Sequence, residues 1–122
     1  MQAILSAIYK LGTRLKNWSY DFAILDQVKV DCPVISIGNL SVGGTGKTPV
    51  TQSLYQYLSD RYKRIVIVSR NYKALVRGVA RIETTHPNAA AFYGDEPAWL
   101  ATHCERAKVY VGARKYETAC LA

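Results

Sequence analysis

Apolar positions at the start of the chain follow the period of an α-helix. They recur at steps of four and three residues: Ile4, Ile8, Leu11, Leu15 and Trp18. This spacing places them on one face of a helix, whereas Lys10, Arg14 and Lys16 fall largely elsewhere. A helix of this kind fits two arrangements. It suits the interface of a membrane, with its amines near lipid phosphates, and it equally suits a terminal helix packed on the protein's own core.

Two short β-branched runs further along predict buried parallel strands. These runs are Pro33–Gly38 and Ile65–Val68. Between them, Thr48–Leu58 repeats apolar residues with helical spacing, and Pro49 is tolerated there because it falls in the first turn. Strand, helix and strand within about forty residues predict a βαβ unit. The remaining elements that we expect are a helix at Glu96–His103, a strand at Lys108–Val111 and a helix from Ala113 to the end.

The connection between the first predicted strand and its helix carries the most informative motif. It contains three glycines followed by a lysine and a threonine: Gly43, Gly44, Thr45, Gly46, Lys47 and Thr48. Residues without Cβ let several backbone N–H groups turn toward phosphate oxygens, and the following helix points its positive dipole end at them. In such a loop the lysine bridges the β and γ phosphates and the threonine hydroxyl faces Mg²⁺. Ser41 stands where the usual pattern has its first glycine.

This motif, in its strand and helix context, sets the expected fold class. We expect an α/β protein with a P-loop NTPase-like parallel sheet flanked by helices, preceded by the amphipathic helix. The expected ligands of the loop are a nucleotide and Mg²⁺. A length of 122 residues suits about one domain.

The charge balance favours an anionic partner. Sixteen Lys and Arg against nine Asp and Glu give a net charge of +7, which suits a nucleotide, nucleic acid, anionic lipid or phosphorylated sugar. Basic residues crowd one stretch without an acidic neighbour: Arg61, Lys63, Arg64, Arg70, Lys73, Arg77 and Arg81. This run has two readings of similar weight, a solvated surface or a docking surface for a phosphate other than the nucleotide's.

Composition also excludes several classes of protein. With 49% hydrophobic and 20% charged residues the chain reads as globular, and no apolar stretch is long enough for a transmembrane helix. The three cysteines lack the paired spacing of zinc ligands and are expected to be reduced thiols in a cytosolic setting. No secretory signal is indicated, because the first apolar stretch precedes the basic residues instead of following them.

Several segments together resemble one known family. Pro33–Pro49, including Ser41, resembles the opening signature of the tetraacyldisaccharide 4′-kinases, which are the lipid A 4′-kinases of Gram-negative bacteria. Val68–Tyr72, Gly94–Pro97 and Val109–Gly112 are similar to later segments of that family, in the same order. The resemblance covers nearly the whole chain and corresponds to the amino-terminal part of the family's members.

The resemblance implies an activity and assigns roles to residues. The family transfers the γ-phosphate of ATP to the 4′-hydroxyl of a tetraacylated glucosamine disaccharide 1-phosphate at the cytoplasmic face of the bacterial inner membrane. By analogy Asp95 is the catalytic base, Lys47 acts on the phosphates, and Glu96 helps Thr48 to hold Mg²⁺. The substrate contacts that it implies are Arg70, Tyr72 and Lys115, with Lys115 standing in the place of a family arginine. The implied partners are ATP, the acylated lipid and an anionic membrane surface, which the protein would meet peripherally.

The resemblance also divides the chain and leaves alternatives open. We expect residues 1–30 to form the interfacial helix and its connection, and residues 31–122 to form the amino-terminal part of a P-loop kinase domain. The family's Asp-Asp-Gly segment and the histidine paired with its base would lie after Ala122, so a truncated kinase is expected. The alternative is a noncatalytic nucleotide-binding fragment or another P-loop ATPase. A nucleic-acid partner is not expected, because the chain lacks a recognised reading motif.

Overall fold

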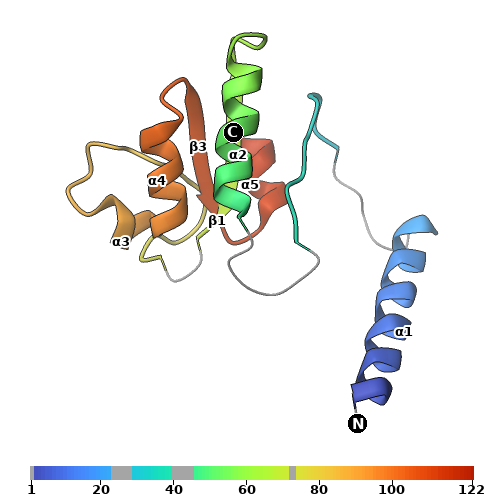
Figure 1. Cartoon of the computed structure of the whole chain (residues 1–122). Coiled ribbons are helices and arrows are strands. Elements are labelled where there is room, and N and C mark those ends of the chain that lie inside the picture. Colours follow the sequence, from blue (N-terminus) through green and yellow to red (C-terminus); the bar gives the residue numbers. More distant parts are fainter. Residues whose placement is uncertain (1, 23–28, 40–45, 72–73) are drawn as a thin grey trace. The chain divides into compact units, whose positions relative to one another are not determined.

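The computed structural model describes residues 2–22, 29–39, 46–71 and 74–122 (Figure 1). The chain divides into two compact units, Met1–Asp31 and Cys32–Ala122. The first unit carries one long helix, and the second unit carries a sheet with its covering helices.

The predicted first helix is confirmed and runs slightly further than its apolar pattern. Helix α1 spans Gln2–Asp21, and the apolar side chains of its predicted face are exposed at Ile8, Leu11, Leu15 and Trp18. Trp18 meets Phe22 edge to face, with ring centroids 4.6 Å apart. Among the residues that the structure describes, no helix combines the length and the hydropathy needed to cross a bilayer.

The second unit is built on a three-stranded sheet in the order β1-β3-β2. Strands β1 (Ile65–Arg70) and β3 (Ala107–Gly112) are parallel, with Ile65 opposite Ala107 and Arg70 opposite Gly112. The short strand β2 (Ala80–Arg81) lies antiparallel to the other side of β3. The two longer strands confirm the predicted parallel pair, and β2 makes the sheet mixed where a wholly parallel one was predicted.

The predicted strand at Pro33–Gly38 is wrong for this structure. The segment belongs to none of the three strands of the sheet, and Val34 and Ile35 are 69% and 59% exposed. A β-branched run fits a pleated surface, but it forms a ladder only where a neighbouring strand offers its backbone and apolar cover. The described residues place no such strand beside it, so propensity alone leaves the run outside the sheet.

Helices cover both faces of this sheet. Helix α2 (Lys47–Ser59) and helix α4 (Asp95–His103) share one face, where Tyr55 and Leu100 pack with Ile65 and Ile67 of β1. The short helix α3 (Ala89–Tyr93) lies beside α4. Helix α5 (Lys115–Leu121) takes the opposite face, because its Thr118 meets Gly112, and alternate residues of a strand point to opposite faces.

The buried core is centred on β3. Val109 and Val111 are 2% and 0% exposed and join a cluster completed by side chains of α3, α4 and the segment around β2. A second cluster joins α2 to α4 through the fully buried Cys104, and Ile67 packs against both clusters. Burial raises the pKa of the Cys104 thiol, so this cysteine stays protonated as part of the core.

Candidate active site

The motif residues converge at one edge of the sheet. Strands β1 and β3 run in the same direction and end together at Arg70 and Gly112. Helices α2 and α4 each precede one of these strands through a short connection, so their amino ends lie at the edge where the strands end (Figure 1). Ligands of open α/β sheets bind outside the carboxyl ends of the strands. We therefore expect ligands to bind at this edge of the sheet.

The amino end of α2 has the backbone that a phosphate loop requires. Gly46 precedes the helix with φ +78°, a left-handed conformation that side chains with a Cβ adopt only under strain. Lys47 and Thr48 begin the helix directly after it. The N–H groups and the positive dipole end at the start of a helix favour an anion at this point.

The side chain of Thr48 connects this helix to α4. Its hydroxyl Oγ1 donates a hydrogen bond to Oε1 of Glu96, which lies 48 residues later in the chain. Glu96 is in the first turn of α4 beside Asp95, and Gly94 precedes the helix with φ +103°. The contact therefore brings the start of the predicted phosphate-loop helix to the start of the Gly-Asp-Glu-Pro motif.

The oxygen atoms of this pair suit a magnesium ion. Hydroxyl and carboxylate oxygens are hard donors, and Mg²⁺ usually takes one or two carboxylates and fills its other positions with water and substrate phosphates. The residues fit that scheme, because the hydrogen bond holds one hydroxyl and one carboxylate next to each other, and both have oxygen lone pairs left over. Among the described residues, neither this site nor any other contains a group of three or more His, Cys, Asp or Glu side chains that could hold a metal, so the remaining ligands of an ion here would be water and phosphate oxygens.

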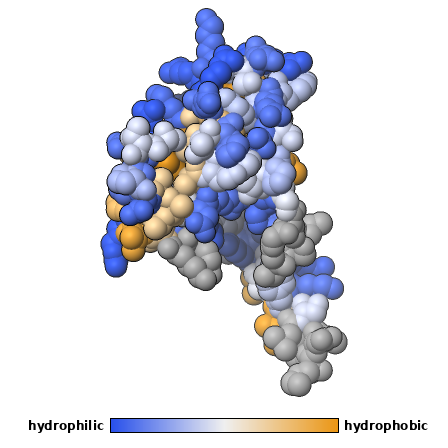
Figure 2. Space-filling view, turned by 60° about the vertical axis from the view of Figure 1, so that its left-hand side comes forward, coloured by the Kyte–Doolittle hydropathy of each residue, from blue (hydrophilic) through white to orange (hydrophobic). Residues whose placement is uncertain are grey.

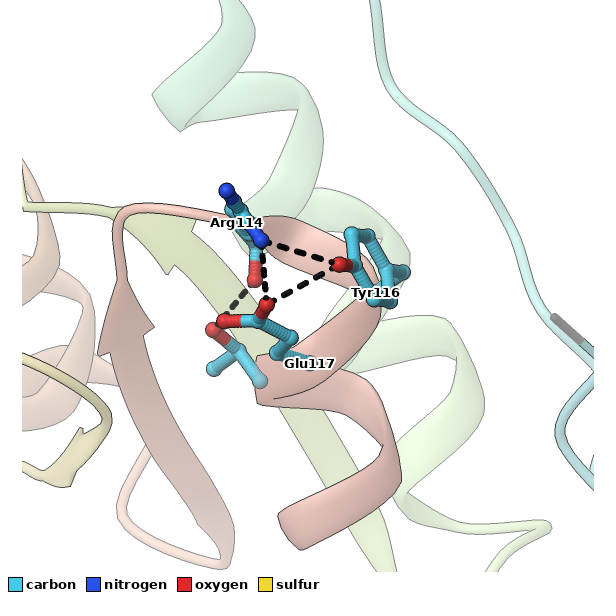
Figure 3. A network of polar contacts seen from close by, with 4 residues as sticks. Arg114, Tyr116 and Glu117 are labelled. Carbon is cyan, nitrogen blue, oxygen red and sulfur yellow. Dashed lines mark hydrogen bonds and ion pairs between the residues drawn. The ribbon is translucent and has the colours of Figure 1, made fainter. Parts of the chain in front are cut away.

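Two of the predicted substrate-contacting residues, Arg70 and Lys115, occupy the same edge. Arg70 is the last residue of β1 and Lys115 is the first of α5, and both side chains are exposed. Beside Lys115, Arg114 donates to Oε1 of Glu117 at 2.9 Å and to the hydroxyl of Tyr116 at 3.3 Å (Figure 3). The hydroxyl of Tyr116 in turn donates to the same carboxylate oxygen at 2.9 Å. The charge of Arg114 is thus paired, while Lys115 extends into solvent.

This network shifts the pKa values of both charged partners. The hydrogen bond from Tyr116, followed by the one from Arg114, holds the pKa of Glu117 below its ordinary value. The hydrogen bond to Glu117 raises the pKa of Arg114, which therefore stays charged. The sequence signal for this pair is the spacing of three residues between an arginine and a glutamate at a helix start.

Four of the predicted site residues lie outside the described residues. They are Gly43, Gly44, Thr45 and Tyr72. Of the remaining candidates, the structure joins Thr48 and Glu96 by a hydrogen bond and places Lys47, Asp95, Arg70 and Lys115 at the same edge of the sheet.

Comparisons with known proteins agree on one family. The sequence model described as Tetraacyldisaccharide-1-P 4′-kinase matches residues 1–122. Proteins named tetraacyldisaccharide 4′-kinase from Bdellovibrio bacteriovorus and Geobacter sulfurreducens are 41% and 40% identical, over 94% and 98% of this chain. The chain spans about a third of their length, 34% and 35% respectively.

A solved structure extends the agreement to the fold. The crystal structure of an "apo" form of LpxK from Aquifex aeolicus in complex with ATP has a TM-score of 0.82 and 34% sequence identity. The match covers 97% of this chain and 38% of that one. The α/β fold with a sheet flanked by helices, and its incompleteness relative to the larger protein, are therefore confirmed.

Proposed function

The chain belongs to the tetraacyldisaccharide-1-P 4′-kinase family, and we propose that it carries the ATP-binding part of an enzyme that phosphorylates the 4′-hydroxyl of a tetraacylated glucosamine disaccharide 1-phosphate. The observation that carries this proposal is the hydrogen bond between Thr48 and Glu96. It unites the nucleotide-binding helix start with the acidic helix start that holds Asp95.

The roles of the residues follow from what phosphoryl transfer needs. The reaction demands positioning and charge neutralisation, and one group that takes the proton of the attacking hydroxyl. Lys47 and the amino end of α2 hold the β and γ phosphates. Asp95 accepts the proton as the 4′-oxygen bonds to the γ-phosphorus, and the bond from that phosphorus to the β–γ bridging oxygen breaks to release ADP. Arg70 and Lys115 offer cationic groups to the 1-phosphate.

The Mg²⁺ ion of this scheme would be held by Thr48 and Glu96. A bound Mg²⁺ supplies charge neutralisation on the phosphate oxygens. Glu96 would supply a carboxylate oxygen from the first turn of α4.

Nucleotide binding tests the proposal on this chain directly. We expect titration calorimetry with ATP and Mg²⁺ to show saturable binding, and Lys47→Ala to weaken it at least tenfold because the phosphates lose their ammonium partner. Glu96→Gln should weaken the dependence on Mg²⁺ more than the affinity for ATP in EDTA. The exposed Lys108 of β3 supplies the matched control, since Lys108→Ala removes a lysine away from the site. Equal binding by Lys47→Ala and Lys108→Ala would overturn the proposal.

Transfer itself tests the role of Asp95. The chain joined to the carboxyl-terminal remainder of the Geobacter sulfurreducens relative should move label from ATP to the disaccharide lipid. Asp95→Asn should lower kcat by about a hundredfold or more while leaving ATP affinity unchanged, because a carboxamide cannot accept the proton. Full activity in Asp95→Asn would remove the residue from this role.

Helix α1 is the proposed contact with the membrane that holds the lipid. Its exposed apolar face and its basic residues suit the boundary between acyl chains and anionic headgroups, at the cytoplasmic face of the inner membrane. Leu11→Asn with Leu15→Asn should abolish sedimentation with phosphatidylglycerol vesicles. Thr13→Asn, a substitution of an exposed polar residue on the same helix, should not. Sedimentation that survives the double substitution would exclude α1 as the contact.

A further inference from the structure

A groove runs along the outer side of α4, where α3 lies beside it. It has a volume of about 320 Å³. The residues of α4 that line it are spaced by three and four positions and form one stripe: Asp95, Ala98, Trp99, Thr102 and His103. The opposite side is supplied by Ala89 and Ala90 of α3 and by Thr84. Figure 2 shows this side of the molecule turned forward, with a band of apolar surface between hydrophilic side chains.

One wall of the groove is already fixed in position. The rings of Trp99 and His103 stack with centroids 3.8 Å apart and an interplanar angle of 16°. Nδ1 of His103 lies 2.8 Å from the carbonyl oxygen of Trp99, to which its N–H donates. Trp99 nevertheless keeps 39% of its surface exposed. A large aromatic surface is thus held open toward solvent, and a ligand can meet it without rearranging it.

The groove is continuous with the candidate active site. Asp95 lines its end at the carboxyl edge of the sheet, and the next residue, Glu96, bonds to Thr48 on the other side of the helix. From Asp95 to His103 the helix rises by about 12 Å. A molecule whose hydroxyl lies at Asp95 therefore has a path for an extended substituent along α4.

The side chains that line the groove favour an apolar substituent. Alanine side chains and an aromatic face form most of it, and neither Lys nor Arg is among the described residues that line it. A phosphate or an anionic headgroup would find no lysine or arginine there and would face the carboxylate of Asp95, whereas an alkyl chain would bury apolar area against Trp99 and the alanines. The substrate class printed in the family's name, a tetraacyldisaccharide 1-phosphate, carries such chains.

We propose that the α3–α4 groove binds an acyl chain of the acceptor lipid and so positions its sugar hydroxyl at Asp95. This inference rests on the proposed function, because it takes the acceptor to be an acylated disaccharide. It assigns Trp99 and Ala90 to substrate binding and makes the groove a determinant of acyl-chain specificity.

Fluorescence of Trp99 tests the groove without any catalytic readout. The chain has two tryptophans, so Trp18→Phe leaves Trp99 as the only one. The probe is dibromoundecanoyl maltoside, an acylated disaccharide whose bromine atoms quench indole on contact, used below its micellar concentration. We expect saturable quenching that undecanoyl maltoside relieves by competition and that maltose leaves unchanged. Absent or non-saturable quenching would overturn the proposal.

Two neighbouring alanines of α3 provide a matched pair of variants. Both Ala90 and Ala91 are exposed, but only Ala90 lines the groove. In the Trp18→Phe background, Ala90→Phe should weaken the quenching affinity at least tenfold by filling the groove, and Ala91→Phe should leave it unchanged. Equal effects of the two substitutions would overturn the proposal, as would quenching displaced by ATP, which would assign the stacked rings to the nucleotide base.

The two proposals fail in distinguishable ways. Calorimetric ATP binding without quenching would leave the kinase assignment in place and remove the acyl groove. Quenching that depends on Ala90, combined with no binding of ATP and Mg²⁺, would keep an acyl-binding groove and remove the kinase assignment. Circular dichroism and the urea midpoint confirm for each variant that the fold is intact.

Discussion

Two short runs of β-branched residues in this molecule have similar side chains and different surroundings. Ile65–Val68 lies in β1, where six residues are in register with β3 and Ile67 packs against both core clusters. Val34–Ile37 lies outside the sheet, and its Val34 and Ile35 are mostly exposed. Both runs can form an extended backbone at little cost.

The difference between them shows what turns propensity into structure. A strand gains stability from cross-strand pairs and from the apolar area that it buries, and both need a neighbour. β1 has β3 on one side, while helices α2 and α5 contact it. The run at Val34–Ile37 has the same preference without this cover. We therefore expect substitutions of residues that pack around β3 to lower the free energy of unfolding more than substitutions in Val34–Ile37.

The largest expected difference comes from the same substitution made in both runs. Ile67→Ala should lower the free energy of unfolding by about 2 to 3 kcal/mol, because it removes apolar contacts from two clusters and leaves a cavity. Ile35→Ala should change it by less than about 0.5 kcal/mol, because its side chain is 59% exposed. Urea unfolding followed by circular dichroism measures both. Equal losses would mean that Val34–Ile37 is packed in solution.

A pair of glycines extends the comparison to the backbone. A Cβ at Gly112, the last residue of β3, would lie 2.1 Å from Oγ1 of the buried Thr118, whereas a Cβ at Gly38 would meet nothing within 4 Å. Gly112→Ala should therefore cost about 1 to 3 kcal/mol through overpacking, and Gly38→Ala should be close to neutral. Thermal unfolding of both variants gives the difference. If the clash with Thr118 causes this loss, Gly112→Ala should lower the free energy of unfolding less in a Thr118→Ala background than in the parent protein.

A smaller effect is expected where α2 is tied to the start of β3. The hydroxyl of Tyr55, on a side chain only 9% exposed, accepts a hydrogen bond of 3.0 Å from the backbone N–H of Arg106. Tyr55→Phe should cost about 1 kcal/mol, because this partly buried N–H loses its acceptor. Tyr57, on the same helix and 60% exposed, gives the control, since Tyr57→Phe keeps the ring that faces Arg61. Equal urea midpoints for the two variants would contradict the assigned role of the hydroxyl.

Local sequence patterns predicted several helices and strands of the second unit. The helical spacing after Gly46 gave α2, the acidic start at Asp95 gave α4, and the apolar run at Lys108–Val111 gave most of β3. The predicted strand at Pro33–Gly38 was wrong, because the residue pattern of a segment does not show whether another strand lies beside it. Strand β2 was missed because two residues carry no period, and their assignment depends on Val111 and Tyr110 opposite them.

In the candidate site, too, sequence patterns predicted some residues, while others are brought together only by the packing of the helices. Motifs identified Thr48 and Glu96, and the roles given to both by resemblance anticipated that they would meet. The α3–α4 groove has no motif, because it arises where alanines of one helix face an aromatic pair on the next. Its residues are unremarkable in the sequence, and only the packing of α3 against α4 brings Ala90 toward Trp99. Spacing along one helix cannot supply that second surface.

The smallest expected effect concerns the polar network just beyond β3. The pKa of Glu117 is lowered in the folded state, so between this value and its ordinary value the unfolded chain binds more protons than the folded chain. The stabilisation by Glu117 is therefore present above the ordinary glutamate pKa and is lost as the pH falls through the lowered one.

Glu117→Gln should accordingly be less stable than the parent near neutral pH and indistinguishable from it in acid. The difference should shrink with salt, because the side chains of Arg114 and Glu117 are 67% and 43% exposed and solvent screens their attraction. Thermal unfolding of both proteins across acidic to neutral pH, at low and high salt, measures it. A difference that persists in acid would place the contribution of Glu117 in packing rather than in its charge. Even then, the effect should stay below that of Tyr55→Phe, because exposed polar contacts hold the end of the paired strands less firmly than buried ones.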